Sequence, residues 1–316
     1  MRVLLLGGTR FLGRRVAESM RSAGHIVTTL SRRPQQNIAS GTHICADRND
    51  GLKCLFGKYF DLVLDFICYD DNDVLQVRSN ILAERYVLIS STWLPRLWSG
   101  CHADELVKCP GVITTDLSGV TLKYLVGKFR AEHSLESLCN SGCSAVSLRL
   151  PIMLGEDDHT GRLDFYLRRF ADGGPVIAVD GGRNHAQIAA MEDLVDVIVR
   201  WSTQIDISRF RVWEALPDTG RTVRAIIQEM SEAAGVNVQL VDVPAKELEN
   251  SLPGFLDKEP FWRETSLPIS SANIYEAVGV SPRLFAQNRT ISLKTYSEVD
   301  ELRQQELIFL VDRISP

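Results

Sequence analysis

The sequence contains no apolar run long enough to span a lipid bilayer, so no transmembrane helix is expected. It also has no excess of basic residues, because 35 Lys and Arg stand against 40 Asp and Glu, for a net charge of −5. Proteins that bind nucleic acid usually carry a basic excess or a basic face. We therefore expect neither a nucleic acid nor a membrane as partner. The apolar stretch 3–6 lies too close to Met1 to be the core of a signal peptide.

Cysteine pairs with a short fixed spacing are absent as well. The seven cysteines show no Cys-x-x-Cys pattern and no zinc-like spacing with histidine. Their odd number in a chain of 316 residues indicates reduced thiols and predicts a cytoplasmic protein. Cys139 and Cys143, near a predicted helix end, are interpreted as packing residues. Asp157, Asp158 and His159 are interpreted as a solvated turn, since adjacent loop residues rarely converge on one ion, so no metal site is expected.

What the sequence does contain is an alternation of short apolar strands with helical segments. Strands are predicted at 3–6, 25–30, around 44–47, 61–66, 86–89 and 144–148, and helices at 11–23, 52–56, 73–82 and 122–138. Further along, helices are predicted at 163–171, 194–201, 222–234 and 298–311, and strands at 210–213 and 238–243. Continuous apolar strands that alternate with helices predict an α/β fold, a Rossmann doubly wound parallel sheet covered on both faces.

Three glycines mark the turn from the first predicted strand to the first helix. Residues 3–15 read VLLLGGTRFLGRR, in which Arg10 replaces the middle glycine of the usual pattern. Such a turn lets backbone N–H groups and the helix N-terminus approach a pyrophosphate. The segment predicts a dinucleotide site, with a plain tight turn as the alternative. Its predicted contacts are Gly7, Gly8, Thr9, Arg10, Phe11, Leu12 and Gly13.

The end of the second predicted strand favours NADP over NAD. An NAD site usually places Asp or Glu there for the ribose 2′-hydroxyl, whereas this sequence has Ser31, Arg32 and Arg33. A hydroxyl and two guanidinium groups suit a 2′-phosphate, and Arg10 is expected to close over the same group. Solvated surface charge is the alternative for the two arginines. Asp47, after the third strand, either accepts a hydrogen bond from the adenine amino group or caps its own loop.

A second motif follows the fifth predicted strand. Ser91 ends that strand, and Tyr124 and Lys128 come later on one predicted helix. A spacing of four residues places the tyrosine and the lysine on one helical face. A nearby ammonium favours the phenolate, which lets the tyrosine exchange a proton nearer neutral pH, and the serine can hold a reacting carbonyl or hydroxyl. The pattern predicts acid–base chemistry at the strand ends, with a merely structural pair as the alternative.

With these motifs, the chain resembles the extended or atypical short-chain dehydrogenases/reductases of the NAD-dependent epimerase/dehydratase superfamily, from residue 1 to about 285. The resemblance is carried by GGTRFLG (7–13), ISS (89–91), YLVGKFRAE (124–132), LRLPIMLGED (148–157) and DLVDVI (193–198). It implies that Tyr124 is the general acid/base, that Lys128 binds the nicotinamide ribose and lowers the tyrosine pKa, and that Ser91 orients the substrate. It also implies that residues 150–153 pass the nicotinamide, which adds Leu150 and Ile152 to the cofactor contacts.

The turn with Arg10 and the stretch LVLDFICYDDNDV resemble a subgroup that includes the chloroplast stem-loop-binding proteins. Those relatives have RNA-associated roles and lack a full Tyr/Lys pair, which this chain keeps. The resemblance further implies a homodimer, formed through the helix of the Tyr/Lys pair and the helix before it. Leu75, Val77, Ile81 and Leu82 give that earlier helix its apolar positions.

The predicted borders divide the chain into an NADP-binding Rossmann domain and a smaller lobe that binds the substrate. The Rossmann domain covers 1–154 with 184–204 returning to it, the lobe covers 155–183 and 205–285, and a C-terminal tail helix covers 286–316. Arg183, His185 and Gln187 are candidates to face the substrate. An aromatic cluster, Phe255, Phe261 and Trp262, either lines a pocket or belongs to the core.

The function expected first is an NADP-dependent oxidoreductase of a small carbonyl or alcohol substrate, with specialised metabolism as a candidate setting. A nucleotide-sugar epimerase or dehydratase with tightly held NAD(P) is an alternative. A dehydratase normally needs an acid pair beside the catalytic residue, whereas Ser91 is followed by Thr92 and Trp93. A non-catalytic protein that senses NADPH or binds RNA is a third alternative, which the acidic charge balance and the Ser/Tyr/Lys set disfavour.

Overall fold

The computed structural model describes most of the chain in two compact units. The described residues are 1–34, 41–50, 52–94, 119–155, 158, 160–209, 211–216, 221–262, 272–281, 293 and 300–314. The first unit, called the sheet unit below, consists of Met1–Pro151, Met191–Leu216 and Ile269–Ser281. The second unit consists of Ile152–Ala190, Pro217–Pro268 and Pro282–Pro316.

The sheet unit is built on one parallel sheet of eight strands, in the order β14-β11-β6-β5-β4-β1-β2-β3. The strands are β1 (Arg2–Leu6), β2 (Ile26–Ser31), β3 (Thr42–Cys45), β4 (Lys58–Asp65), β5 (Ile81–Ser91), β6 (Ser144–Leu150), β11 (Val212–Glu214) and β14 (Ala272–Asn273). The chain runs outward from β1 to β3, then returns to place β4 on the other side of β1. This reversal is the topological switch point of a doubly wound sheet. The predicted fold class is therefore confirmed.

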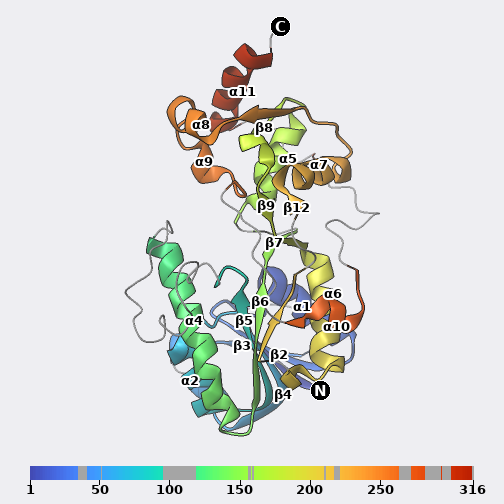
Figure 1. Ribbon diagram of the computed structural model, residues 1–316. Helices are drawn as coiled ribbons and strands as arrows, with labels where there is room; N and C mark the ends of the chain where they lie inside the picture. The colour runs from blue at the N-terminus through green and yellow to red at the C-terminus, as the bar shows by residue number, and fades with distance from the viewer. Residues whose placement is uncertain are drawn as a thin grey trace. The chain divides into compact units, whose positions relative to one another are not determined.

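Helices cover both faces of this sheet (Figure 1). One face carries α2 (Asp71–Asn80) and α4 (Gly119–Cys139), which pack against each other. The other face carries α1 (Phe11–Ser22), α6 (Met191–Gln204) and α10 (Ile274–Val278), with α6 in contact with both of the others. The described residues of this unit also form short 3-10 turns at η1 (Arg48–Asp50), η2 (Lys53–Leu55) and η5 (Ile207–Arg209).

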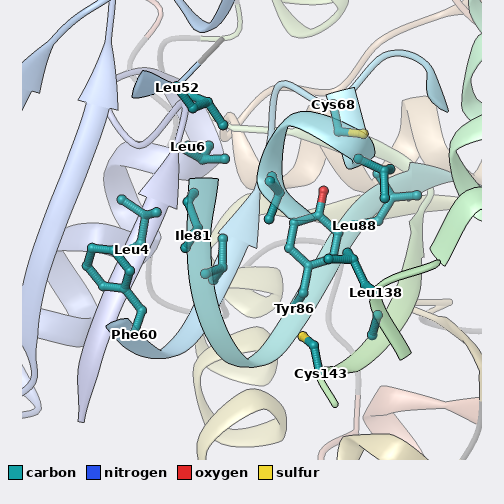
Figure 2. Close-up of a cluster of buried hydrophobic side chains, with 14 of the residues drawn as sticks. Leu4, Leu6, Leu52, Phe60, Cys68, Ile81, Tyr86, Leu88, Leu138 and Cys143 are labelled. Carbon is teal, nitrogen blue, oxygen red and sulfur yellow. The ribbon is translucent and has the colours of Figure 1, made fainter. Parts of the chain in front are cut away.

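The core beneath α2 and α4 is formed by alternate residues of the central strands (Figure 2). In β1 these are Leu4 and Leu6, and in β5 they are Tyr86 and Leu88, all of them fully buried. Successive side chains of a strand point to opposite faces of the sheet. The same periodicity places Asp65 of β4 and Ser90 of β5 on this face, near the carboxyl ends of their strands. The core thus holds the strands in a register that brings polar residues to their carboxyl ends.

One predicted helix ends earlier than expected, and this changes the prediction for the homodimer. The helix predicted at 73–82 ends at Asn80, and Ile81 and Leu82 open β5 instead. Val77 and Ile81 are buried within the chain. Of the four apolar positions predicted for a dimer contact, only Leu75 is exposed on α2, and Leu82 is exposed on a strand. The homodimer itself stays a prediction.

The predicted lobe border also differs from the structure. Residues 205–216 and 272–281 were predicted for the smaller lobe, yet they belong to the sheet unit. The reason is strand pairing, because β11 joins β6 in parallel and β14 joins β11. Such long-range pairing leaves no local signal in a three-residue strand.

The second unit holds three small two-stranded sheets and five helices among its described residues. The strands pair as β7 (Ile152–Leu154) with β10 (Ile188–Ala190), β8 (Val176–Val179) with β13 (Leu240–Val243), and β9 (His185–Ala186) with β12 (Arg221–Thr222). The helices are α5 (Arg162–Ala171), α7 (Val223–Ala233), α8 (Ala245–Ser251), α9 (Phe255–Lys258) and α11 (Glu301–Ile314), with a 3-10 turn η4 (Asp180–Gly182).

Aromatic residues and paired charges hold the second unit together. Phe255 and Phe261 are fully buried, and the Trp262 indole donates to the Leu256 carbonyl at 2.6 Å. This supports the interpretation of the aromatic cluster as core. The guanidinium of Arg303 on α11 binds both carboxylate oxygens of Asp172, at 2.7 and 2.8 Å, and so ties α11 to the end of α5.

No helix in the part of the chain that the structure describes is both long and apolar enough to cross a membrane. The same residues contain no group of three or more His, Cys, Asp or Glu arranged to hold a metal ion.

Candidate active site

The glycine turn between β1 and α1 is packed so closely that side chains do not fit at three of its positions. A Cβ on Gly8 would lie 2.7 Å from the Leu5 Cβ, and a Cβ on Gly13 would lie 2.6 Å from the Gly7 carbonyl oxygen. Gly7 has a φ of +85°, and a Cβ there would lie 2.6 Å from a methyl group of Ile67. The turn follows the carboxyl end of β1. At these three glycines no side chain covers the backbone.

The N-terminus of α1 fits an anion. Its first turn contains no acidic residue, and no side chain caps it. Helix N-termini with open N–H groups bind phosphates, so the turn and the helix suit a pyrophosphate. Arg10 is the N-cap, with a φ of −137° that any residue adopts, which explains why a glycine is not needed at this middle position. Its side chain is exposed.

The side chains of Arg32 and Arg33, after β2, are exposed to solvent. The backbone carbonyls of both residues accept hydrogen bonds from neighbouring side chains. The Arg33 carbonyl accepts hydrogen bonds from the Ser31 hydroxyl at 3.1 Å and from His43 Nε2 at 2.9 Å. The Arg32 carbonyl accepts from the Cys45 thiol at 3.5 Å. The two arginine side chains are thus placed for an external anion, and Ser31 is occupied with holding the backbone.

Asp47 lies beside Arg32, in the position of a loop cap. Its Oδ1 accepts from the Asn49 amide at 2.9 Å, and its Oδ2 lies 4.0 Å from the Arg32 guanidinium. Of the two interpretations of Asp47, the structure shows the capping contact.

Lys128 is almost fully buried and is held by two backbone carbonyls. Its Nζ donates to the carbonyl oxygens of Cys68 and Ile89, both at 2.6 Å, and only 3% of the residue is exposed. Burial lowers the pKa of its ammonium, and the neighbouring Cys68 and Asp65 act against this. The Nζ lies 5.7 Å from the ring centre of Tyr124, which is 38% exposed. The structure therefore brings together the predicted Tyr/Lys pair, with the tyrosine facing solvent.

Ser91 lies at the same edge of the sheet. It is the last residue of β5 and stands opposite Leu150, the last residue of β6. Its Oγ accepts from the Trp93 amide at 3.2 Å, which leaves the hydroxyl proton for another acceptor. Lys128 binds the carbonyl two residues before Ser91. Ile152, the remaining predicted contact, lies in the second unit, where it pairs with Ile188.

Helix α4 is fixed at this place by contacts that are not predicted from the sequence. A Cβ on Gly127 would lie 2.2 Å from the Tyr69 carbonyl oxygen, so the helix approaches the loop after β4 without a side chain between them. One turn after Lys128, the Glu132 carboxylate binds both Nε and Nη2 of Arg149, at 3.1 and 2.8 Å. A glycine inside a helix costs stability unless it has a packing reason, and this was the available signal.

A buried ionic network orders the loop after β4. Arg48 is 5% exposed and binds Asp65 Oδ1 at 2.7 Å and Asp73 Oδ1 at 2.8 Å. Asp65 also accepts from the Tyr86 hydroxyl at 2.8 Å, and Asp73 accepts from the Tyr69 amide at 2.6 Å. Burial raises the pKa of the Asp73 carboxyl despite the Arg48 guanidinium. In the sequence, Arg48 had the character of an ordinary polar loop residue.

The other singled-out residues have structural surroundings. Cys143 belongs to the core and burial raises its pKa to about 12, while Cys139 packs against the same cluster. Asp158 accepts from the backbone and hydroxyl of Thr160, as expected of a turn, and its neighbours at 157 and 159 lie outside the described residues. Arg183 and His185 are exposed in the second unit, and Gln187 is buried there.

Comparison with solved structures identifies the fold. UDP-glucose 4-epimerase from Thermotoga maritima, solved with UDP-glucose, aligns over 100% of both chains with 14% identity and a TM-score of 0.57. The Bordetella bronchiseptica enzyme WbmF, solved with NAD⁺, aligns over 77% of this chain and 81% of its own, with 12% identity and a TM-score of 0.59. This chain has their fold.

A third solved structure is similar over most of its length. MoeE5, in complex with UDP-glucuronic acid and NAD, aligns over 90% of this chain and 94% of its own, with 18% identity and a TM-score of 0.56. No family model and no curated protein sequence matches the chain. Because the identities are below one fifth, the likeness concerns the fold.

Proposed function

We propose that the chain is an NADP-dependent oxidoreductase of the extended short-chain dehydrogenase/reductase type, acting on a small carbonyl or alcohol substrate. The observation that carries the proposal is the placement, at the carboxyl edge of one parallel sheet, of a closely packed glycine turn and a buried lysine beside an exposed tyrosine. Ligands of open α/β sheets bind at this edge. The fold shared with proteins solved with NAD supports a nicotinamide dinucleotide.

The residues at the turn and after β2 fit NADP. The turn of Gly7, Gly8 and Gly13 and the N-terminus of α1 would hold the pyrophosphate. The exposed Arg32 and Arg33 would bind the 2′-phosphate, since no acidic residue ends β2. Arg10 would close over the same phosphate, and Leu150, at the end of β6, would contact the nicotinamide. A bound nicotinamide supplies the hydride donor or acceptor.

The chain's own residues would move the proton. Tyr124 donates a proton from its phenol to the substrate oxygen during reduction and takes it back during oxidation. The Lys128 ammonium, 5.7 Å from the ring centre, favours the phenolate. Ser91 uses its remaining hydroxyl proton to hold the substrate oxygen. Together the three residues orient the substrate and exchange one proton with it.

A nucleotide-sugar epimerase with tightly held cofactor is the second candidate. It is favoured by the likeness to structures solved with UDP-glucose and with UDP-glucuronic acid. Such an enzyme takes a hydride and returns it, so it shows product without net change in the cofactor.

Turnover assays separate the two candidates. The purified chain is incubated with NADPH or NADP⁺ and with panels of carbonyls, alcohols and UDP-sugars, and both reduced-nicotinamide absorbance and product are followed. Net cofactor consumption supports the oxidoreductase, and product without it supports the epimerase. In either case Tyr124→Phe is expected to lower turnover about 100-fold or more while dinucleotide binding persists. Full activity of this variant would contradict the role of Tyr124.

A further inference from the structure

A second tyrosine lies at the lysine, from a different part of the chain. The Tyr69 ring, in the loop after β4, has its centre 5.1 Å from Lys128 Nζ, closer than the Tyr124 ring at 5.7 Å. The two rings are 6.4 Å apart and tilted by 57°. The ammonium therefore faces an aromatic ring from the loop and another from its own helix.

Tyr69 is unusually exposed for a residue whose backbone is held so firmly. The residue is 53% exposed. Its amide donates to Asp73 Oδ2 at 2.6 Å, and Asp73 is in turn bound by Arg48. Its carbonyl lies against Gly127, which leaves no room for a Cβ. Partial burial and the carboxylates of Asp65 and Asp73 raise the pKa of the Tyr69 phenol.

We propose that Tyr69 is a positioning residue for Lys128, whose ring attracts the ammonium and holds it charged beside Tyr124. The inference rests on the proposed function, in which a charged Lys128 favours the Tyr124 phenolate. A cation within about 6 Å of a ring centre is attracted by the π face, and more strongly where water is excluded. Lys128 Nζ lies 5.1 Å from the centre of the Tyr69 ring. Water is largely excluded from Lys128, because the residue is only 3% exposed.

The ring acts among other groups that also bear on the ammonium. Asp65 on β4, Cys68 in the loop, Asp73 on α2 and Glu132 on α4 favour its charged form. Arg48 neutralises Asp65 and Asp73, and Arg149 binds Glu132. Besides these paired carboxylates, two aromatic rings and two backbone carbonyls of the described residues lie at the ammonium and oppose the cost of its burial.

The test is an NMR titration of the whole chain labelled with ¹³C at the lysine Cε, without dinucleotide or substrate. Lys128→Arg assigns the signal. Tyr69→Phe keeps the ring and is expected to leave the titration unchanged. Tyr69→Leu keeps apolar bulk without a π face, so Lys128 is expected to titrate at lower pH. Tyr59→Leu, an exposed tyrosine on β4 bound to Glu84, is the matched control and is expected to behave as wild type.

A second variant keeps the test decisive if Tyr69→Leu fails to fold. Pentafluorophenylalanine at position 69 has the shape of Phe but an inverted ring quadrupole, and it is also expected to lower the pH of titration. The proposal is overturned if Lys128 titrates as in wild type without a π face at position 69, or if Tyr69→Phe shifts it equally. Failure here leaves dinucleotide binding untouched, so it is distinct from failure of the proposed function.

Discussion

Gly127 on α4 and Tyr69 in the loop after β4 are in such close contact that a Cβ on the glycine would stand 2.2 Å from the tyrosine carbonyl oxygen. Real Cβ atoms do not approach backbone oxygen so closely, so the contact requires glycine. It brings a helix and a loop together at the place where Lys128, the next residue of the helix, binds the carbonyls of Cys68 and Ile89. The absence of a side chain at Gly127 thus lets α4 lie close to this loop, where Lys128 binds the two carbonyls.

Gly127→Ala is expected to destabilise the chain by about 1–3 kcal/mol, the usual cost of overpacking. Gly119→Ala on the same helix is the matched control, since a Cβ there meets no atom of the described residues within 4 Å and alanine has a higher helix propensity than glycine. Urea unfolding of both variants measures the difference. Equal stability of the two variants would mean that the helix yields without cost.

Arg48→Met is expected to cost about 3–5 kcal/mol, because it leaves the buried carboxylates of Asp65 and Asp73 without their guanidinium partner. Adding Asp65→Asn should restore part of the loss, since the two effects are coupled. Arg78→Met, at an exposed position in the last turn of α2, serves as the control. The free energy of unfolding decides the matter, and a loss no greater than that of Arg78→Met would count against a buried network.

The acid stability of the second unit is expected to depend on Asp172. Burial acts to raise the pKa of this carboxyl, but the bonds from Arg303 and the Gly174 amide outweigh it and the pKa is lowered. A group with a depressed folded pKa stabilises above its unfolded pKa and loses this as pH falls through the folded pKa. Its contribution is therefore full at neutral pH and disappears in strong acid.

Asp172→Asn accordingly lowers the free energy of unfolding at pH 7, and the difference from wild type shrinks on acidification below about pH 4. Asp257→Asn, at an exposed position of α9, is the control and should show a smaller difference. Denaturant unfolding at several pH values measures this. A difference that stays constant down to strong acid would contradict the ionic clamp.

The residues that would select NADP are expected to contribute unequally to the affinity for NADPH. Arg32→Ala should weaken NADPH binding about tenfold or more and leave NADH binding nearly unchanged, since hydrogen bonds to charged groups contribute about 1.5–3 kcal/mol. Ser31→Ala should have a smaller effect, because the Ser31 hydroxyl donates to the Arg33 carbonyl. Calorimetric titration with both dinucleotides gives the ratio. A larger loss of NADPH binding in Ser31→Ala than in Arg32→Ala would reverse this assignment.

The parts of the site that could be predicted from the sequence are those with local patterns. The glycines between a strand and a helix form one such pattern, and Tyr and Lys four residues apart form another. Both can be recognised in the sequence because their spacing is local. The roles of Arg48 and Gly127 were not predicted, since their partners lie 17 or more residues away and are chosen by packing. The hydrogen bond from the Ser31 hydroxyl to the Arg33 carbonyl was not predicted either.

Element type was predicted better than element ends. The apolar pair Ile81 and Leu82 continued the helical pattern of α2, but both residues pair with β4 as the start of β5. A short apolar run fits either period, and only the neighbouring strand decides. The same holds for Val212–Glu214, whose place in the large sheet depends on β6, and for Ala272–Asn273, whose place depends on β11.

The central claim is that the glycine turn and α1 hold a dinucleotide at the edge where Tyr124 and Lys128 lie. Thermal unfolding of the purified chain, freed of copurified nucleotide, is followed during titration with NADPH and with NADH. A ligand of the folded state stabilises it by RT ln(1 + [L]/Kd), about 2.7 kcal/mol at a hundredfold excess over Kd. We expect NADPH to stabilise the folded chain more than NADH does, and Gly13→Ala to abolish this stabilisation. Folded protein that responds to neither dinucleotide would contradict the account.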